Sequence, residues 1–499
     1  MSDVRRKISL TVLLLLLFTI TAVAQDAIIQ RGCRVGTPRP AGTALRRGAP
    51  GGQPKLVGGD FYQGDLHQLV VMTAFADRIF KGDETATLEQ WNKIFNAVNF
   101  TEGSFKGSVH DYFCAQSYDQ FRPVFDLVFV QVSGNAKKYA SDNTDENSQY
   151  LVQDIMEVLK TRNIDWSLYD WNGDGFVNQL LIIYAGHGMN DYSGDDLIWP
   201  HQWWMSEHKK DGQKDVYCDP IPVTYDDKEY QVDCYCALAE LTSKNDYGSF
   251  GTICHEYTHC FGFPDFYYVD NYGKSTSYVQ GWDLMDRGNY NGGGYCPTAY
   301  SAHERWLMGW LTPIELKEAT TITDMPSLSD EGKAYLIRND GYENEYYFVE
   351  NRQRTKWDAS LSGNGILVFH IDYDPELWVG LDDYVNKTSR QHYLLFHANN
   401  STTPYSYWPY PYLNNNSLTN TSTPAASLWN ANSDDSKLMN KPLTNMRVTS
   451  GLAAFDFMGG ATAISQQPSA NSHQTTLLYR IGPVTIVRDA AGCVRKVIQ

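Results

Sequence analysis

The segment from Cys254 to Asp265 places the strictest condition on how this chain folds. It reads Cys-His-Glu-Tyr-Thr-His-Cys-Phe-Gly-Phe-Pro-Asp. Residues four apart share one face of an α-helix, so a helix over 254–260 can direct the imidazoles of His255 and His259 at one ion. Gly262 can end that helix by adopting a positive φ, and Pro264 prevents the helix from continuing. The spacing therefore predicts a short helix followed at once by a turn back toward it.

This turn predicts a metal site. Imidazole nitrogens suit zinc, and a catalytic zinc has three protein ligands and one open position. Asp265, at the end of the turn, is the favoured third ligand, and Glu304 on a helix expected over 300–308 is the alternative. Glu256 follows the first histidine and can act as the general base that takes a proton from zinc-activated water.

Two residues further along extend this site. Met285 lies in Gly281-Trp282-Asp283-Leu284-Met285-Asp286, ahead of a glycine-rich loop. This is similar to the methionine turn of metzincins, which implies that Met285 forms a hydrophobic floor beneath the metal. Tyr290 could donate a hydrogen bond to the developing oxyanion, as tyrosines do in some metzincins.

Upstream of this helix, short apolar runs alternate with amphipathic segments. Strands are expected over 68–75, 126–132 and 180–185, and helices over 88–98 and 148–159, with Thr87 as the N-cap of the first helix. Strands that alternate with helices predict an α/β (α+β) sheet domain. The similarity to metzincins implies that this is a metzincin-like zinc protease domain.

The pattern changes after Leu311. Segments 334–337, 345–349 and 365–371 are short and rich in β-formers, which predicts an all-β, sandwich-like domain with long loops over 398–440. The expected organisation is a signal peptide (1–24), a leader or short pro-segment (25–58), the catalytic domain (59–312), the all-β domain (313–460), and a linker with a C-terminal tail (461–499).

The first 24 residues carry three basic residues, a short apolar run and the ending Ala22-Val23-Ala24, which is typical of a secretory signal peptide. The nine cysteines fit an oxidising compartment, and Cys218 with Cys234 or Cys236 is a plausible local disulfide. Cys33 in the leader could cap the zinc in a latent form, although a disulfide is the favoured alternative.

A second candidate metal site lies in Asp170-Trp171-Asn172-Gly173-Asp174-Gly175-Phe176-Val177-Asn178. The spacing matches the first half of an EF-hand loop, which predicts a structural calcium site. Its expected ligands are Asp170, Asn172, Asp174, the carbonyl of Phe176, and Asn178, with Asp165 as an alternative to Asn178. An ordinary Asx-rich turn before a strand is the competing interpretation, because the twelfth position is Leu181 and not Glu.

With these motifs in place, the chain resembles the immune-inhibitor-A-like family of secreted zinc metalloproteases over roughly residues 65–460. Besides the zinc motif, the resemblance rests on residues 107–113, 198–203, 282–285, 307–311 and 350–353. It implies a metzincin-like catalytic domain, zinc, structural calcium and protein substrates. It also implies His255, His259 and Asp265 as ligands and Glu256 as the base.

The sequence thus predicts a secreted zinc endopeptidase that acts on protein or peptide substrates. The net charge of −17 argues against nucleic acid as a partner, and no run beyond the signal peptide could span a membrane. The tail over 475–499 resembles a shortened cell-surface attachment tail, and a plain terminal strand is the alternative. The competing function is a surface binding protein or adhesin on an inactive protease scaffold, against which the intact Glu256 argues.

Overall fold

The computed structural model describes residues 62–140, 147–190, 192, 194–210, 217–248, 250–269, 275–378, 385–386, 389–401 and 407–460, together with the backbone of three short strands within 476–498. The predicted signal peptide, the leader and Cys33 lie outside these ranges. Contacts divide the chain into one compact unit that ends at Gly459 and a second that begins at Gly460.

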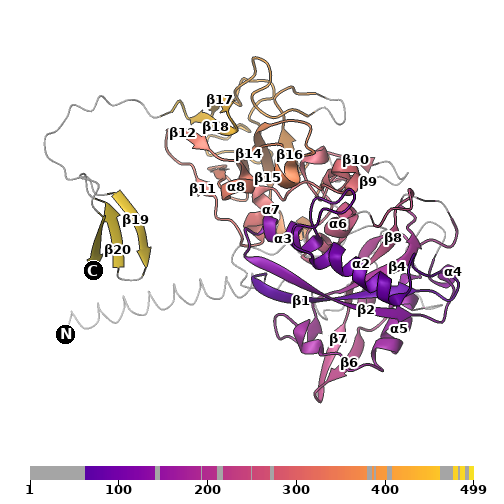
Figure 1. The fold of residues 1–499 in the computed structure, drawn as a ribbon. Helices are drawn as coiled ribbons and strands as arrows, with labels where there is room; N and C mark the ends of the chain where they lie inside the picture. Colours follow the sequence, from indigo (N-terminus) through magenta and orange to yellow (C-terminus); the bar gives the residue numbers. More distant parts are fainter. Residues whose placement is uncertain are drawn as a thin grey trace, which may run out of the picture. The chain divides into compact units, whose positions relative to one another are not determined.

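A five-stranded, mostly parallel sheet organises the N-terminal half of the first unit, in the order β2-β1-β4-β8-β5 (Figure 1). The four strands β2, β1, β4 and β8 run parallel, and β5 pairs antiparallel with β8 at one edge. The bounds are β1 (Gly64–Ala74), β2 (Phe121–Gln131), β4 (Leu180–His187), β5 (His201–Trp204) and β8 (Cys234–Leu241). The apolar runs that predicted these strands are buried in the sheet, and a mixed α/β fold is confirmed.

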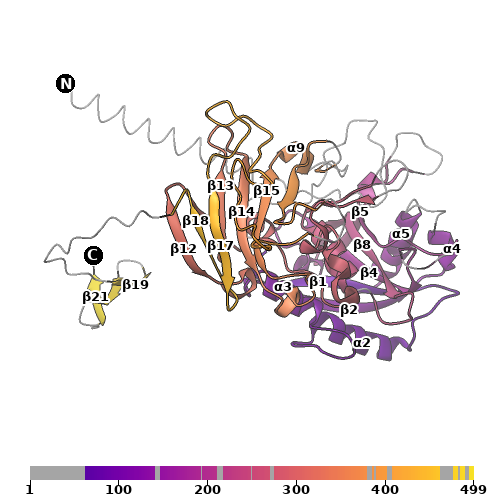
Figure 2. The same cartoon turned by 90° about the horizontal axis from the view of Figure 1, so that it is seen from above.

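Helices cover both faces of this sheet because successive crossovers run in opposite directions. The connection from β1 to β2 contains α2 (Glu84–Asn96) and α3 (Val109–Gln116), and the return from β2 to β4 contains α4 (Ala136–Tyr139) and α5 (Ser148–Leu159). Right-handed crossovers in opposite directions place their helices on opposite faces. Figure 2 shows α2 and α5 on opposite sides of the sheet.

The predicted helix over 148–159 is confirmed to the residue as α5. The N-cap predicted at Thr87 is wrong. The helix begins four residues earlier, where the side chain of Asp83 accepts from the amide of Ala86 at 2.9 Å. Thr87 lies inside the helix and is buried, because its face of α2 packs on the sheet.

The second half of this unit is built from two antiparallel sheets. One sheet has five strands in the order β11-β13-β14-β15-β16, and its neighbouring strands are antiparallel except for the parallel pair β11–β13. The other sheet has three strands in the order β12-β18-β17. The bounds are β11 (Ile314–Glu315), β12 (Thr320–Met325), β13 (Tyr335–Arg338), β14 (Glu345–Arg352), β15 (Gly365–Asp372), β16 (Tyr393–Phe396), β17 (Leu443–Thr449) and β18 (Leu452–Phe457). The three β segments predicted beyond Leu311 correspond to β13, β14 and β15.

These two sheets stack on one another (Figure 2). Alternate residues explain why every position of β14 is buried: Tyr347 and Val349 face the three-stranded sheet, whereas Tyr346 and Phe348 join the core of the N-terminal half. The larger sheet therefore shares one of its faces with the α/β core. A boundary at residue 312 stays a prediction, since both halves belong to one compact unit.

Shorter elements complete the unit. Three strands form a side sheet, namely β3 (Phe176–Val177), β6 (Ile221–Tyr225) and β7 (Lys228–Val232). The remaining elements named here are α6 (Phe250–Cys260), β9 (Tyr268–Val269), β10 (Ser275–Thr276), η4 (Gly288–Gly294), α7 (Ala302–Leu307), α8 (Leu328–Glu331) and α9 (Pro375–Trp378).

The second unit contains an antiparallel three-stranded sheet of β19 (Thr476–Ile481), β20 (Val484–Arg488) and β21 (Val494–Ile498). Strand structure in the tail is thus confirmed, whereas an attachment role stays a prediction. In the described ranges no helix combines the length and apolar character needed to cross a membrane.

None of the seven cysteines in the described part of the chain forms a disulfide. The predicted bridge from Cys218 to Cys234 or Cys236 is therefore wrong for this structure. Cys234 and Cys236 sit on the central strand β8, where the Sγ of Cys234 accepts from Gln202 at 3.3 Å and the thiol of Cys236 contacts Cys260. Both thiols are thus directed into the packed core.

Candidate metal centre

Helix α6 carries the two predicted histidines, and both are buried, with 4% of His255 and 3% of His259 exposed. Each imidazole is held from behind by a backbone carbonyl. Nδ1 of His255 lies 3.0 Å from the carbonyl oxygen of Leu284, and Nδ1 of His259 lies 2.7 Å from that of Phe263. A carbonyl can only accept, so each Nδ1 must carry the proton, and in the neutral ring each Nε2 then presents a lone pair.

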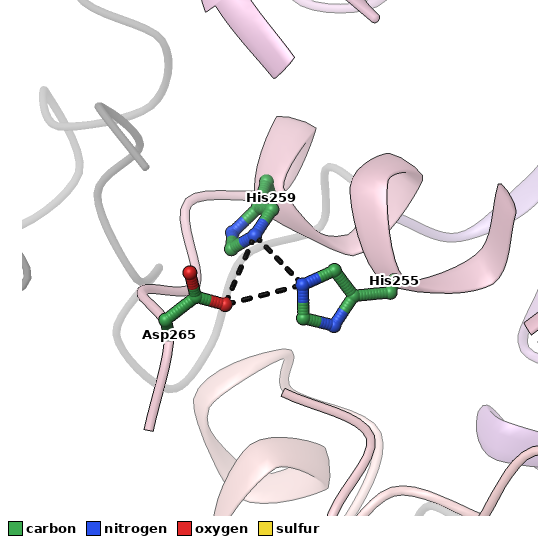
Figure 3. A group of neighbouring side chains, drawn as sticks. All are labelled: His255, His259 and Asp265. Carbon is green, nitrogen blue, oxygen red and sulfur yellow. Dashed lines mark hydrogen bonds and ion pairs between the residues drawn. The ribbon is translucent and has the colours of Figure 1, made fainter. Parts of the chain in front are cut away.

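Helix α6 ends at Cys260, two residues before Gly262, as the sequence predicted. Gly262 adopts φ +100°, and its amide donates to the carbonyl of His259 at 2.8 Å. The chain then turns back, so that Asp265, which is 1% exposed, reaches the two imidazoles (Figure 3). Oδ1 of Asp265 lies 3.1 Å from Nε2 of His255 and 3.3 Å from Nε2 of His259, and the two Nε2 atoms are 3.2 Å apart.

This triangle fits a zinc ion. Ligand bonds of about 2.0–2.1 Å in tetrahedral geometry separate ligand atoms by about 3.3–3.4 Å, close to the three separations found here. The Oδ1 of Asp265 is buried and has no hydrogen-bond partner within the described residues. Three acceptor atoms that converge without a proton between them repel one another unless a cation sits among them. In the described ranges, these residues form the group of His, Cys, Asp and Glu side chains that could hold a metal.

The charges at the site also favour a cation. Burial works against a charged imidazole at His255, but the adjacent carboxylate of Asp265 outweighs it and raises the pKa of His255 to about 9. Burial likewise works against an ionised Asp265, yet the charges of His259 and His255 lower the pKa of its carboxyl to about 2. Asp265 therefore stays ionised at neutral pH, and its negative charge attracts either a proton or a metal ion to this position.

Glu256 is partly buried beside the two histidines. Loss of solvent is the main influence on its carboxyl and raises the pKa of Glu256, while the charges of His255 and His259 act in the opposite direction. A carboxylate with a raised pKa near a metal site is suited to accept a proton and release it again.

Met285 is fully buried in the turn that begins at Asp283. Its carbonyl accepts from the amide of Phe266, which follows Asp265, at 2.8 Å, and its own amide donates to Oδ1 of Asp283 at 2.8 Å. Since the carbonyl of the neighbouring Leu284 holds His255, the turn around Met285 touches both arms of the candidate site. This placement fits the predicted floor.

The side chain of Glu304, the alternative ligand, caps helix α7. Its side chain accepts from the backbone amide of Ser301 at 2.6 Å in the capping box of α7, and it is not part of the metal-binding group. Burial, followed by the charge of Asp283, raises the pKa of Glu304 well above its usual range. A buried side chain that caps its own helix and lies outside the metal-binding group is a poor competitor for Asp265.

Tyr290 lies on η4, which packs against α6. Loss of solvent around its hydroxyl group and the charge of Glu256 raise the pKa of Tyr290, whereas the hydrogen bond with Asn289 acts in the opposite direction. The predicted contact of Tyr290 with the oxyanion stays a prediction.

The predicted calcium loop folds as a chain of Asx turns. Both carboxylate oxygens of Asp170 accept backbone amides, from Asp174 at 3.1 Å and from Gly175 at 3.0 Å. Asn172 donates to Asp174 at 2.6 Å, and Oδ1 of Asn178 accepts from Trp171 at 2.6 Å. Oδ1 of the alternative ligand Asp165 accepts from Ser167. These bonds also fit the competing interpretation, so the calcium site stays a prediction.

Sequence reasoning did not find the groups that orient the imidazoles. Every residue has a backbone carbonyl, so the identities of Leu284 and Phe263 do not show that their carbonyls hold the histidines. Only their positions beside Met285 and Gly262 could have indicated this role. It also left His201 without a role. This residue is buried and lies with His208 around the hydroxyl group of Tyr235, at 3.0 and 2.7 Å respectively.

An α/β sheet whose helix presents two histidines and a returning carboxylate has the geometry of a metallopeptidase catalytic domain. A comparison with protein-family models identifies that domain: the model for the immune inhibitor A peptidase M6 catalytic domain matches residues 90–310. This match identifies a metallopeptidase catalytic domain over residues 90–310, and it confirms the resemblance predicted from the motifs. A search of curated proteins found no match.

Proposed function

We propose that this protein is a secreted, zinc-dependent endopeptidase with a metzincin-like catalytic domain, which hydrolyses peptide bonds within protein substrates. The observation that carries the proposal is the triangle of His255, His259 and Asp265, whose three acceptor atoms lie 3.1–3.3 Å apart with both Nδ1 atoms committed to carbonyls. The ligand set of two imidazoles and a carboxylate is one that zinc accepts and that leaves one position open.

A zinc ion held there would supply a Lewis acid that polarises the scissile carbonyl and activates a water molecule. The chain's own residues carry the proton. Glu256, next to the first ligand on α6, takes the proton from the attacking water and delivers it to the amine of the leaving fragment. Burial raises the pKa of its carboxyl, which helps Glu256 to hold the proton between these two steps.

The decisive experiment compares metal content and peptide cleavage in the full chain and in Glu256→Gln, which keeps the size of the side chain. We expect about one zinc per chain in both proteins and a loss of roughly 10²–10⁴-fold or more in kcat for the variant, the range found for general acid–base catalysis. Glu89→Gln is the matched control, because Glu89 is exposed on α2. It should retain both zinc and activity.

Two results would contradict the proposal. The wild-type protein could bind no zinc, or it could hold zinc and still leave every tested protein and peptide intact. The second result would favour a surface binding protein on an inactive scaffold.

We also propose that the loop over 170–178 binds calcium in a structural role, through Asp170, Asn172, Asp174, Phe176 and Asn178. The support is the spacing of its oxygen-bearing side chains and the positive φ of Gly173 and Gly175, which curls the loop. Calcium should raise the melting temperature of the wild-type protein in a background of saturating zinc. Asp174→Ala should abolish that rise, and an equal rise in both proteins would exclude this loop.

Export and surface attachment complete the proposal. The signal-like sequence at 1–24 should be removed after Ala24 during secretion, which mass spectrometry of the exported protein can test. If the tail attaches the protein to cells, deletion of residues 461–499 should move activity from the cell surface to the medium without lowering the total.

A further inference from the structure

Tyr393, on the first position of β16, reaches from the antiparallel sheet to the methionine turn. Its side chain is fully buried. The hydroxyl group lies 2.8 Å from Oδ2 of Asp283 and 3.0 Å from Oγ of Ser301. The phenol O–H donates to Oδ2 of Asp283.

Asp283 connects Tyr393 to the candidate metal ligand His255. While Oδ2 accepts from Tyr393, Oδ1 accepts the amide of Met285 at 2.8 Å, which closes a tight turn around Leu284. The carbonyl of Leu284 is the group that accepts from Nδ1 of His255 at 3.0 Å. The direction of that carbonyl, and with it the direction of the imidazole, depends on how Asp283 is held.

The ring of Tyr393 contacts the other arm of the site. It stacks on Phe266, the residue after Asp265, with ring centroids 4.1 Å apart and an angle of 27° between the planes. Asn386 strengthens this contact: its Nδ2 atom donates to the carbonyls of Phe266 and Tyr393, both at 2.7 Å, and its Oδ1 atom accepts from the amide of Tyr393 at 3.0 Å.

One side chain from the antiparallel sheet thus braces both segments that build the metal site, at the turn behind His255 and at the residue beside Asp265. The amide of Phe266 also donates to the carbonyl of Met285 at 2.8 Å, so the two braced segments are joined to each other. A shift of either segment would change the separation of the ligand atoms. The same contacts give the antiparallel half of the unit a direct part in shaping the catalytic half.

We propose that Tyr393 is a positioning residue for the metal site, and that Asn386 assists it by fixing Phe266. The inference rests on the proposed function, in which His255 and Asp265 are zinc ligands. Residues that orient metal ligands through hydrogen bonds affect metal affinity or activity by about 10–100-fold when removed.

The test uses Tyr393→Phe, which removes the hydroxyl group and keeps the ring that stacks on Phe266. The control is Tyr347→Phe on the neighbouring strand β14. Its hydroxyl group is also inside the protein and donates to the carbonyl of Ser427 at 2.7 Å, but its ring belongs to the opposite core. Tyr347→Phe loses one hydrogen bond to a carbonyl, whereas Tyr393→Phe loses the contacts with Asp283 and Ser301, so both should be less stable than the wild type and Tyr393→Phe should lose more.

Two readouts separate positioning from general destabilisation: the zinc dissociation constant by chelator competition, and the visible absorption spectrum of the cobalt(II)-substituted full chain. We expect Tyr393→Phe to bind zinc about 10-fold more weakly and to alter the cobalt spectrum. Tyr347→Phe should match the wild type in both. Unchanged zinc affinity and spectrum in Tyr393→Phe would overturn the inference.

A second variant covers the case in which Tyr393→Phe does not fold. Asn386→Ala removes the two donors to Phe266 and Tyr393 and leaves Asp283 untouched, and we expect it to weaken zinc binding by a similar factor. Zinc affinity equal to the wild type would then overturn the inference. If the wild-type protein itself bound neither zinc nor cobalt, the proposed function would fail first, and that outcome is distinguishable from a failure of positioning alone.

Discussion

The backbone of Gly251 lies against the carbonyl oxygen of Asn289 so closely that a Cβ atom on Gly251 would be 1.9 Å from that oxygen. Gly251 belongs to the first turn of α6, and Asn289 belongs to η4. The absence of a side chain is therefore what allows the metal-binding helix to pack on the segment that follows the methionine turn.

Gly251→Ala should destabilise the protein by about 1–3 kcal/mol or more, since the clashing atom is backbone and cannot rotate away. Chemical denaturation followed by intrinsic fluorescence measures this loss. Gly64→Ala offers a comparison without a clash, because its Cβ atom would meet nothing within 4 Å. At φ +81° it should cost only the backbone strain of about 1–2 kcal/mol. A smaller loss at Gly251 than at Gly64 would show that α6 and η4 can separate easily.

Arg352 should be one of the most sensitive positions in the chain. Its guanidinium group is fully buried and binds Asp358 at 2.7 and 2.9 Å, Glu350 at 2.9 Å and the carbonyl of Ala299 at 2.8 Å. Arg352→Leu leaves two buried carboxylates without a cation, which typically costs about 3–5 kcal/mol. Arg352→Lys keeps the positive charge but cannot make the bidentate contact with Asp358. Its stability in urea denaturation should therefore lie between that of the wild type and that of Arg352→Leu.

The control for this prediction is an exposed ion pair. Lys93 lies 3.2 Å from Glu102, with 48% and 58% of the two side chains exposed. Lys93→Met should change stability by less than about 1 kcal/mol. Similar losses for Arg352→Leu and Lys93→Met would mean that the buried network contributes no more than a surface pair.

The contrast between α6 and α2 shows which parts of this fold the sequence can predict. Around α6, two histidines and a glycine at fixed spacing predict the helix and the turn that follows it, and they favour Asp265 over Glu304 as the third ligand, which stays a prediction. At α2 both Asp83 and Thr87 are acceptable N-caps by residue type. The choice between them depends on which face meets the sheet, and that is tertiary information.

The start of β2 and the contact between Tyr393 and Asp283 could not be predicted from the sequence for a similar reason. Strand β2 begins at Phe121, five residues before the predicted start, and Pro123 lies in the missed part. Proline lacks the amide that a central strand needs, but β2 is an edge strand and tolerates it. The brace from Tyr393 to Asp283 joins residues 110 positions apart. No local pattern carries such a pairing, because it depends on how two sheets pack.

The surroundings of Glu345 predict how the stability of the folded protein depends on pH. Its buried carboxylate accepts from Nε2 of His370 at 2.7 Å and from the amides of Trp429 and Asn430. Burial works against the charge, but these donors, led by His370, outweigh it and lower the pKa of Glu345. A lowered pKa means that the folded state binds its proton less readily than the unfolded chain. The stabilisation is therefore present above the unfolded value of about 4.3 and disappears as the pH falls through the folded value.

Glu345→Gln should consequently destabilise the protein by about 1–3 kcal/mol at pH 7, because its amide group meets donors where the carboxylate accepted. The difference from the wild type should shrink below about pH 4.3. Denaturation curves at pH 7, 5 and 3.5 measure this trend, with the exposed Glu343→Gln as control. A difference that stays constant down to pH 3.5 would show that Glu345 titrates in the same way in both states.

The third metal ligand can be tested by comparing Asp265→Asn with Glu304→Gln. Asp265→Asn keeps the shape of the side chain but removes the negative charge that faces both imidazoles, so zinc affinity should fall by at least about 100-fold. Glu304 is fully buried, and burial raises the pKa of its carboxyl well above the usual range. A glutamine keeps the size of this side chain and can still accept from the amide of Ser301, so Glu304→Gln should bind zinc within a few-fold of the wild type. Zinc titration against a competing chelator gives both constants, and circular dichroism establishes that each variant is folded. If the folded Glu304→Gln protein lost zinc while Asp265→Asn kept it, the ligand assignment would have to be reversed.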